Sequence, residues 1–196
     1  IPQSEVGGAV NLELLKTMIH EKSPKIVILS SSITLFPFPV KEVSSLCREK
    51  GIIFVYDASH PLGLIAGKQF QEPFKEGADI IIGSTHKTFP GPQGGIILGK
   101  GNCSEIMKAT DFVTVDNIHI NRIAALGVAL LEMKEYGEEY AIQIVKNAIK
   151  LASALEKIGI NVRYRDYGYT QSHQFILEWR SDYSEFTNRI EQANII

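Results

Sequence analysis

The sequence predicts an α/β fold with a mostly parallel sheet, and three observations support this. Short runs rich in Val and Ile recur along the first two-thirds of the chain, at residues 25–30, 52–57 and 78–83. These runs are continuous rather than alternating, which is typical of strands buried on both faces. Segments with helical spacing or rich in Gly and Pro separate them, as parallel strands require.

The other elements of this layer alternate as the fold class demands. One helix precedes the first strand and another follows it, ending near a glycine suited to a helix terminus. The last strand follows the third after a short turn that permits antiparallel pairing. The predicted bounds are helices at 10–21 and 40–51, loops at 32–39 and 58–70, and a fourth strand at 94–99.

The rhythm changes after the sheet. Two long helical patterns are predicted within residues 119–158, the second starting near Glu138, and a strand, a strand and a helix follow. We therefore divide the chain into part of a large domain, linking helices and the start of an incomplete small α+β domain. The predicted boundaries are 1–118, 119–158 and 159–196.

Composition excludes several classes of protein. A formal net charge of −2 and a pI near 6.2 predict no nucleic-acid-binding surface. No apolar run approaches the roughly 18 residues that span a bilayer, so no membrane partner is expected. Cys47 and Cys103 have no metal-ligand spacing and form no disulfide framework, which favours the cytoplasm. The chain starts at Ile1 without a methionine, and we expect it to be a piece of a longer protein.

Polar residues gather at the ends of the three predicted strands. The first strand ends in Ser30-Ser31-Ser32, the second in Asp57 with His60 three residues later, and the third in Ser84-Thr85-His86-Lys87. Ligands bind outside the carboxyl ends of strands in open α/β sheets. If the three strands are neighbours, a carboxylate, two imidazoles, hydroxyls and an amine converge at one edge.

Taken singly, each of these residues has an ordinary structural explanation. Asp57 suits a turn cap, and Lys87 suits a solvated surface position. Together they suit pyridoxal phosphate, because a buried lysine loses its proton readily and can attack the cofactor's carbonyl. Asp57 would support the protonated ring nitrogen, while Ser84 and Thr85 would donate to the phosphate. A Lys/Asp pair with a purely structural role is the alternative.

The ordered motifs resemble serine hydroxymethyltransferase. Asp-x-x-His, Gly-Leu-Ile-Ala, Thr-His-Lys-Thr and Gly-Pro-x-Gly-Gly occur in this order within "VYDASHPLGLIAG" and "ADIIIGSTHKTFPGPQGGIIL". The similarity extends from about Lys25 to Ala141. It implies a three-layer fold of the pyridoxal-phosphate-dependent type I class, the aspartate-aminotransferase type.

The resemblance assigns roles residue by residue. It implies that Lys87 forms the covalent aldimine with pyridoxal 5'-phosphate and that Asp57 pairs with the pyridine nitrogen. His60 and Ser32 would lie near the ring's phenolic oxygen, and His86 would neighbour the lysine. Ser84 stands where related enzymes contact the phosphate. The catalytic set is then Lys87, His60 and His86, and the cofactor-binding set is Ser32, Asp57, His60, Ser84, Thr85, His86 and Lys87.

The sequence departs from the family pattern at three places. Thr34 replaces a tyrosine, Gln93 replaces an arginine, and Asp116-Asn117 replaces a Gly-Gly pair that cradles the phosphate from the partner subunit. A carboxylate at Asp116 would repel phosphate at short range. The resemblance also places the ring-stacking segment and the carboxylate-binding arginine outside this chain.

The family reaction transfers a one-carbon unit between serine and glycine by retro-aldol cleavage. The resemblance implies an amino-acid substrate, tetrahydrofolate as co-substrate and a homodimer, since sites of this fold type are completed by the partner. Without that partner, apolar helix faces such as the one around Ile123 and Leu126 are expected to be partly exposed. Two alternatives stay open: a threonine-aldolase-like or cysteine-desulfurase-like enzyme, and a non-catalytic paralogue or fragment.

Overall fold

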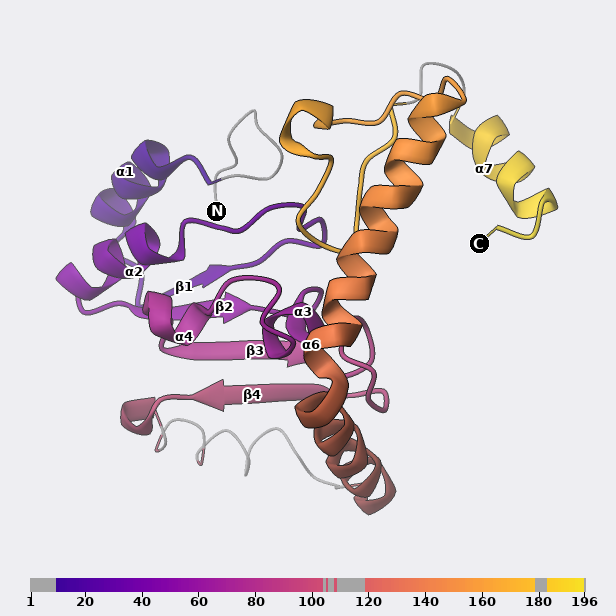
Figure 1. Ribbon diagram of the computed structural model, residues 1–196. Helices are drawn as coiled ribbons and strands as arrows, with labels where there is room; N and C mark the ends of the chain where they lie inside the picture. The colour runs from indigo at the N-terminus through magenta and orange to yellow at the C-terminus, as the bar shows by residue number, and fades with distance from the viewer. Residues whose placement is uncertain (1–9, 104, 106–107, 109–118, 179–182, 196) are drawn as a thin grey trace.

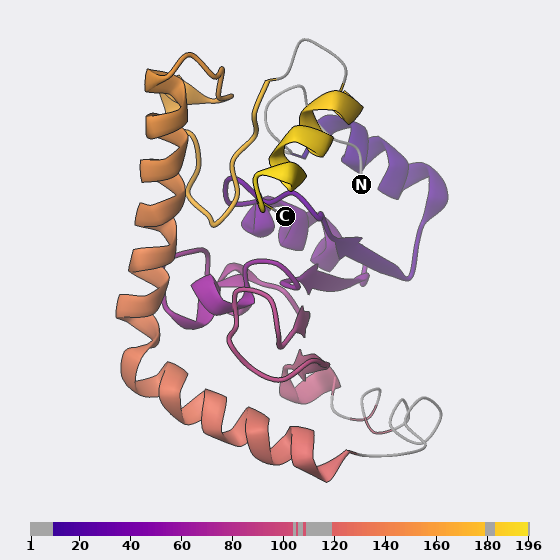
Figure 2. The ribbon, with the colours of Figure 1, turned by 90° about the vertical axis from the view of Figure 1, so that its right-hand side faces the viewer.

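The computed structural model describes residues 10–103, 105, 108, 119–178 and 183–195. A four-stranded sheet lies at its centre, and a long helix passes beside the carboxyl ends of the parallel strands (Figures 1 and 2). In chain order the elements are α1 (Leu12–Lys22), β1 (Ile26–Leu29), α2 (Val40–Glu49), β2 (Ile53–Asp57), α3 (Leu62–Ala66), α4 (Pro73–Glu76), β3 (Ile80–Ser84), β4 (Gly95–Gly99), the 3-10 turn η1 (Gly101–Cys103), α6 (Ile120–Lys157), the 3-10 turn η2 (Arg165–Tyr167) and α7 (Tyr183–Gln192).

The strand order confirms the predicted sheet. β1, β2 and β3 are adjacent and parallel, and β4 pairs with β3 in the antiparallel direction, as Figure 1 shows by the arrowheads. In this register Ile28 lies opposite Val55, and Asp57 lies opposite Ile82. The carboxyl ends of the three parallel strands therefore meet at one edge, as the candidate site requires.

One face of the sheet carries the hydrophobic core. The helices α1 and α2 pack over this face and form the second layer of the core, because the apolar side of a sheet must be covered by another element. Burial of such side chains contributes roughly 1.5–3 kcal/mol each to folding. The buried residues that form this layer include Leu15, Ile19, Val27, Leu29, Val40, Val43, Phe54, Tyr56 and Ile81.

The opposite face is less buried than the continuous Val/Ile runs predict. Ile26 and Ile28 of β1 are 51% and 50% exposed, and Ile97 of β4 is 50% exposed. The prediction of burial on both faces is therefore wrong for these strands within the described residues. An apolar run shows that both faces of a strand could be buried. Whether they are buried depends on which segments pack over the strand.

A single helix, α6, replaces the two helices predicted within residues 119–158. Gly137 does not interrupt it, because this glycine is buried against α3. A methyl group added at Gly67 would lie 2.3 Å from the carbonyl oxygen of Gly137 and 2.4 Å from the Cβ of Ala141. The two glycines thus let α3 and α6 approach closely, and packing offsets the low helix propensity of Gly137. Figure 2 shows that α6 bends along its length.

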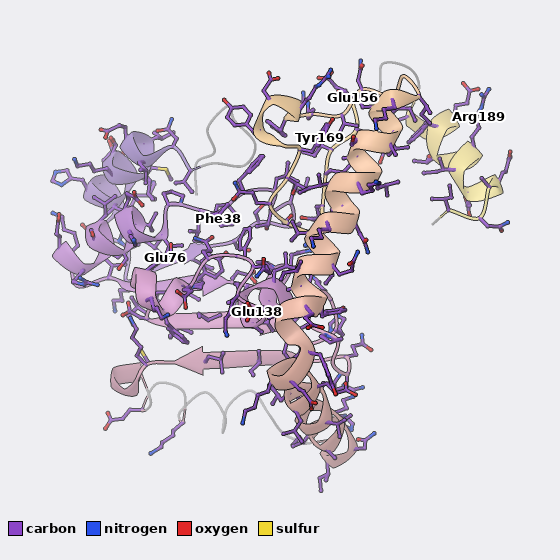
Figure 3. The ribbon with its side chains drawn as sticks, viewed as in Figure 1. Phe38, Glu76, Glu138, Glu156, Tyr169 and Arg189 are labelled. Carbon is purple, nitrogen blue, oxygen red and sulfur yellow. The ribbon has the colours of Figure 1, made fainter. Side chains whose placement is uncertain are left out.

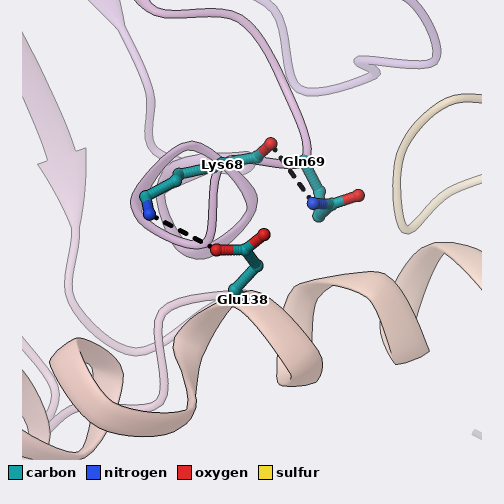
Figure 4. A network of polar contacts seen from close by, with 3 residues as sticks. All are labelled: Lys68, Gln69 and Glu138. Carbon is teal, nitrogen blue, oxygen red and sulfur yellow. Dashed lines mark hydrogen bonds and ion pairs between the residues drawn. The ribbon is translucent and has the colours of Figure 1, made fainter.

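A surface ion pair accompanies this contact. Nζ of Lys68 lies 3.3 Å from Oε2 of Glu138, and the side-chain amide of Gln69 donates to the Lys68 carbonyl at 3.3 Å (Figure 4). Both charged side chains are mostly exposed, so solvent screens the pair and its contribution to stability is small. Close glycine packing, rather than this pair, joins the two helices.

The exposed apolar helix face expected around Ile123 is confirmed. Ile123 is 56% exposed, while Leu126 is partly buried against the core. Leu130 and Leu131, on the following turn, are also largely exposed. None of the helices in the described part of the chain is long and apolar enough to cross a membrane.

The segment after α6 is mostly irregular rather than two strands. Its described residues form an isolated antiparallel bridge between Val162 and Leu177, and α7 confirms the predicted final helix. The hydroxyl of Tyr169 donates to Glu156 of α6 at 2.5 Å, and Figure 3 shows these two side chains together. The segment is thus tied to α6 through Tyr169 and, further along, to the loop after β1 through Gln171 and Gln174.

Gly63 offers a test of this packing. A methyl group at this position would lie 2.1 Å from the carbonyl oxygen of Thr88, which is backbone and moves only with the loop that carries Lys87. We expect Gly63→Ala to destabilise the protein by about 1–3 kcal/mol or more through overpacking. Urea unfolding measures this. The control is Gly127→Ala in α6, where a methyl group meets nothing within 4 Å; an equal loss in both variants would contradict the packing argument.

Candidate active site

Asp57 ends β2 and is held by the neighbouring loops. Its Oδ2 accepts a hydrogen bond from the Ser30 hydroxyl at 2.7 Å, and its Oδ1 accepts one from the Ser59 N–H at 2.8 Å. Burial acts to raise the pKa of Asp57, but the hydrogen bonds from Ser59 and Ser30, helped by the charge of Lys87, outweigh burial and lower the pKa. The carboxylate is therefore ionised at neutral pH and oriented by two strand ends.

His60 and Lys87 meet at the same edge. Nζ of Lys87 lies 3.1 Å from Nε2 of His60, although the residues belong to loops after different strands. Burial lowers the pKa of His60, the Lys87 charge lowers it further, and Asp57 opposes both. His60 is thus neutral at neutral pH, and its unprotonated nitrogen can accept a hydrogen bond from the lysine. The Lys87 side chain itself is exposed, so the expectation of a buried lysine is wrong for this chain.

Backbone contacts fix the distance between these two loops. The hydroxyl of Thr88 donates to the carbonyl oxygen of His60 and accepts from the Gly63 N–H at 3.0 Å. Thr88 is buried, and it directly follows Lys87. Thr88 therefore ties the loop carrying the lysine to the loop carrying the histidine.

His173 is a site residue that sequence reasoning missed. Its ring lies parallel to that of His60, with centroids 5.9 Å apart and an interplanar angle of 12°. Burial lowers its pKa to about 4, and the positive charges of His60, when that ring is protonated, and of Lys87 act in the same direction. Its Nδ1 is buried and has no hydrogen-bond partner among the described residues. The only local signal was a histidine between polar residues in "TQSHQF".

The other predicted residues lie around this centre. Ser84 ends β3 half-buried, while the buried Thr85 donates its hydroxyl to the Pro92 carbonyl at 2.6 Å. Nδ1 of His86 lies 3.2 Å from both the N–H and the carbonyl oxygen of Gly94, and its ring is exposed. Ser32 accepts a bond from Gln174 through its carbonyl oxygen. Among these, Ser84 is the hydroxyl that best suits a phosphate.

Two of the three departures from the family pattern, Thr34 and Gln93, lie among the described residues. Thr34 is buried, and its N–H donates to Oε1 of Gln174 at 2.8 Å. Gln93 is exposed in the turn before β4. Asp116-Asn117 lies outside the described residues. Ser30, which was grouped with Ser32 but assigned no role, is the serine that bonds Asp57.

The two half-buried histidines, His60 and His173, make stability depend on pH. The pKa of His173 is lowered from 6.5 to about 4 in the folded protein, so the unfolded chain binds a proton first as pH falls. We therefore expect the free energy of unfolding to decrease as the pH is lowered from about 6.5 to about 4. His60, whose pKa is also lowered, acts in the same direction.

The test compares denaturant unfolding of the wild type and His173→Phe across this range. The variant keeps a flat ring without a titrating group, so its stability should depend less steeply on pH. The same slope in both proteins would contradict the prediction.

These residues fit pyridoxal phosphate. An ionised carboxylate suits a protonated ring nitrogen, a lysine amine suits the aldehyde, and the end of β3 offers the Ser84 hydroxyl for the phosphate. The unused hydrogen-bonding capacity of His173 Nδ1 lies beside the same histidine and lysine. Among the described residues, no cluster of His, Cys, Asp or Glu could hold a metal ion.

Comparison with known proteins supports this interpretation. A solved L-threonine transaldolase from Pseudomonas fluorescens, in an internal aldimine state, superposes with a TM-score of 0.83 at 34% identity. The match covers 90% of this chain and 41% of that one. With the mostly parallel sheet, this places the chain in the fold type I class of pyridoxal-phosphate-dependent enzymes.

The family follows from the sequence comparisons. The serine hydroxymethyltransferase family model matches residues 3–193. Serine hydroxymethyltransferases of Methanosphaera stadtmanae and Methanocella arvoryzae are 49% and 46% identical over 195 and 190 residues, each covering 95% of this chain. The chain belongs to the serine hydroxymethyltransferase family. It spans about half the length of these relatives, 46% and 45% respectively.

Proposed function

We propose that this chain is part of a pyridoxal-phosphate-dependent glycine hydroxymethyltransferase that interconverts serine and glycine. The observation that carries the proposal is the 3.1 Å contact between Lys87 and His60 beside the ionised Asp57. Family membership and the likeness to a fold type I enzyme support it. Lys87 is the amine that bonds the cofactor's aldehyde carbon.

Each residue has a role in this proposal. Bound pyridoxal phosphate supplies an electron sink for the negative charge that develops at the substrate's α-carbon. Asp57 holds the ring nitrogen protonated, and Ser30 and Ser59 keep its carboxylate aimed. Neutral His60 accepts a hydrogen bond from the Lys87 amine and so holds it at the edge of the sheet. Ser84 donates to the phosphate, His86 flanks the lysine, and Ser32 and Thr85 shape the loops beside them.

The experiment adds pyridoxal phosphate and then L-serine to the chain, with and without tetrahydrofolate. We expect an absorbance band near the visible edge and glycine formation that depends on tetrahydrofolate. A missing band contradicts the cofactor, whereas serine cleavage that ignores tetrahydrofolate contradicts hydroxymethyl transfer.

A second function is favoured by one observation. The solved L-threonine transaldolase matches 90% of this chain at 34% identity, so a protein of the same fold acts on another amino acid. The alternative is an aldol-type exchange on threonine with an aldehyde acceptor. Turnover of L-threonine without tetrahydrofolate, in the same assay, would favour it over the first proposal.

We further propose that the protein works as a homodimer in the cytoplasm. Exposed apolar side chains on α6, among them Ile123, Leu130 and Leu131, suit burial against a second copy. Sedimentation analysis of the wild type and Leu131→Glu tests this, since a charge in the interface should yield monomers. If Leu131→Glu sediments as a dimer, as the wild type does, this placement of the interface is wrong.

A further inference from the structure

The stacked histidines join parts of the chain that are remote in sequence. His60 follows β2, whereas His173 lies in the irregular segment after η2. The other charged groups near His60 are Lys87 and Asp57, and those near His173 are His60 and Lys87. His173 is therefore placed to influence His60 by packing on its ring.

Four hydrogen bonds hold the segment that carries His173. The side chain of Gln174 forms two of them: its Oε1 accepts from the Thr34 N–H at 2.8 Å, and its Nε2 donates to the Ser32 carbonyl at 3.0 Å. The Gln171 N–H donates to the Leu35 carbonyl at 2.8 Å, and the Thr170 hydroxyl donates to the same oxygen at 3.2 Å. The loop after β1 thus fixes His173.

The His60 ring needs such support. Thr88 holds the main-chain carbonyl of His60, which leaves rotation of the imidazole free. Its Nε2 contacts Lys87, a long and exposed side chain that restrains the ring weakly. A parallel ring beside it, with centroids 5.9 Å apart, limits its rotation and covers part of it from water.

We propose that His173 is a positioning residue, which holds the His60 imidazole against Lys87 and is itself set in place by the Gln174 clamp. The inference rests on the proposed function for the role of His60 and Lys87 in binding pyridoxal phosphate. It needs a flat ring at position 173 and a side-chain amide at position 174. It also assigns a site function to the segment after α6, which the cofactor motifs do not include.

The test uses the full 196-residue chain in two measurements. Imidazole NMR follows the titration of His60 without cofactor, and absorbance titration measures the affinity for pyridoxal phosphate. In His173→Ala, water reaches the His60 ring, so its titration midpoint should rise by roughly half a pH unit or more. Affinity for pyridoxal phosphate should fall on the order of tenfold, because the site is less ordered.

Conservative and matched variants separate positioning from general damage. His173→Phe keeps the flat ring and should restore both the midpoint and the affinity to near the wild-type values. Gln174→Ala should change both in the same direction as His173→Ala, because it removes the clamp. Gln171→Ala is the control: its side chain is exposed and its link to Leu35 uses the main chain, so neither value should change.

Two outcomes overturn the inference: an unchanged His60 midpoint in His173→Ala, or a His173→Phe variant that behaves like His173→Ala. If His173→Ala does not fold, the same measurement is made on Gln174→Ala. An unchanged His60 titration midpoint in that variant overturns the proposal. Failure of the proposed function is distinct, because the wild type would then bind no pyridoxal phosphate while the His60 titration still reports on the stack.

Discussion

Lys87→Ala should abolish the absorbance band near the visible edge that pyridoxal phosphate produces on the protein. No other described amine lies at the contact with His60, so the cofactor loses its covalent bond to the chain. Turnover of serine should fall by on the order of 10⁴-fold, the scale on which removal of a covalent catalyst acts. Absorbance spectroscopy and initial rates measure the two effects.

The matched control is Lys68→Ala. Lys68 is also an exposed lysine, but it forms the surface ion pair with Glu138 on α6. Screening by water makes this pair worth little, so the band, the rate and the stability should all stay near the wild-type values. A band that persists in Lys87→Ala, or that vanishes equally in Lys68→Ala, would contradict the assignment of the lysine.

Asp57→Asn should lower turnover by on the order of 10²–10³-fold, with a smaller effect on cofactor affinity. The amide has nearly the same shape as the carboxylate, but it carries no charge to keep the cofactor's ring nitrogen protonated. Steady-state rates and absorbance titration separate the two effects. Asp79→Asn is the comparison, because Oδ2 of Asp79 accepts a structural bond from the Phe54 N–H at 2.9 Å. That variant should change stability and leave the rate per folded molecule unaltered.

The same carboxylate predicts a stability change in acid. Its pKa is lowered in the folded protein. Its stabilising contribution is therefore complete above the unfolded value of about 3.8 and is lost as pH falls through the lower folded value. Asp57→Asn has no carboxyl at this position, so its free energy of unfolding should decrease less than that of the wild type as the pH is lowered. An acid transition that is identical in the variant would show that the hydrogen bonds from Ser30 and Ser59 do not favour the ionised form.

Local sequence was sufficient to predict the site edge. Each of Asp57, His60 and Lys87 follows an apolar run, and such runs form strands whose carboxyl ends align when they are parallel neighbours. The prediction that these residues converge is confirmed by the contacts of Ser30 with Asp57 and of His60 with Lys87. Their catalytic roles stay predictions.

Local sequence was not sufficient for the single helix α6 or for the burial of the sheet. Gly137 has low helix propensity, and only its contact with Gly67 explains why the helix continues through it. Ile26 and Ile28 have the apolarity of buried residues, yet half of each remains exposed. In both cases the outcome depends on what packs against the residue, which a local pattern does not contain.

By itself, therefore, the sequence determined the order of the four strands with α1 and α2, and the residues that stand at the strand ends, since these depend on neighbours a few positions away. It did not predict α3, which lies within the predicted loop at 58–70, or α4. Only the tertiary structure brought His173 onto His60 and Gln174 onto the loop after β1, across separations of 140 and 142 residues in the two Gln174 bonds. Contacts of such range form when separate segments fold against one another, and no periodicity in the chain encodes which side chains will meet.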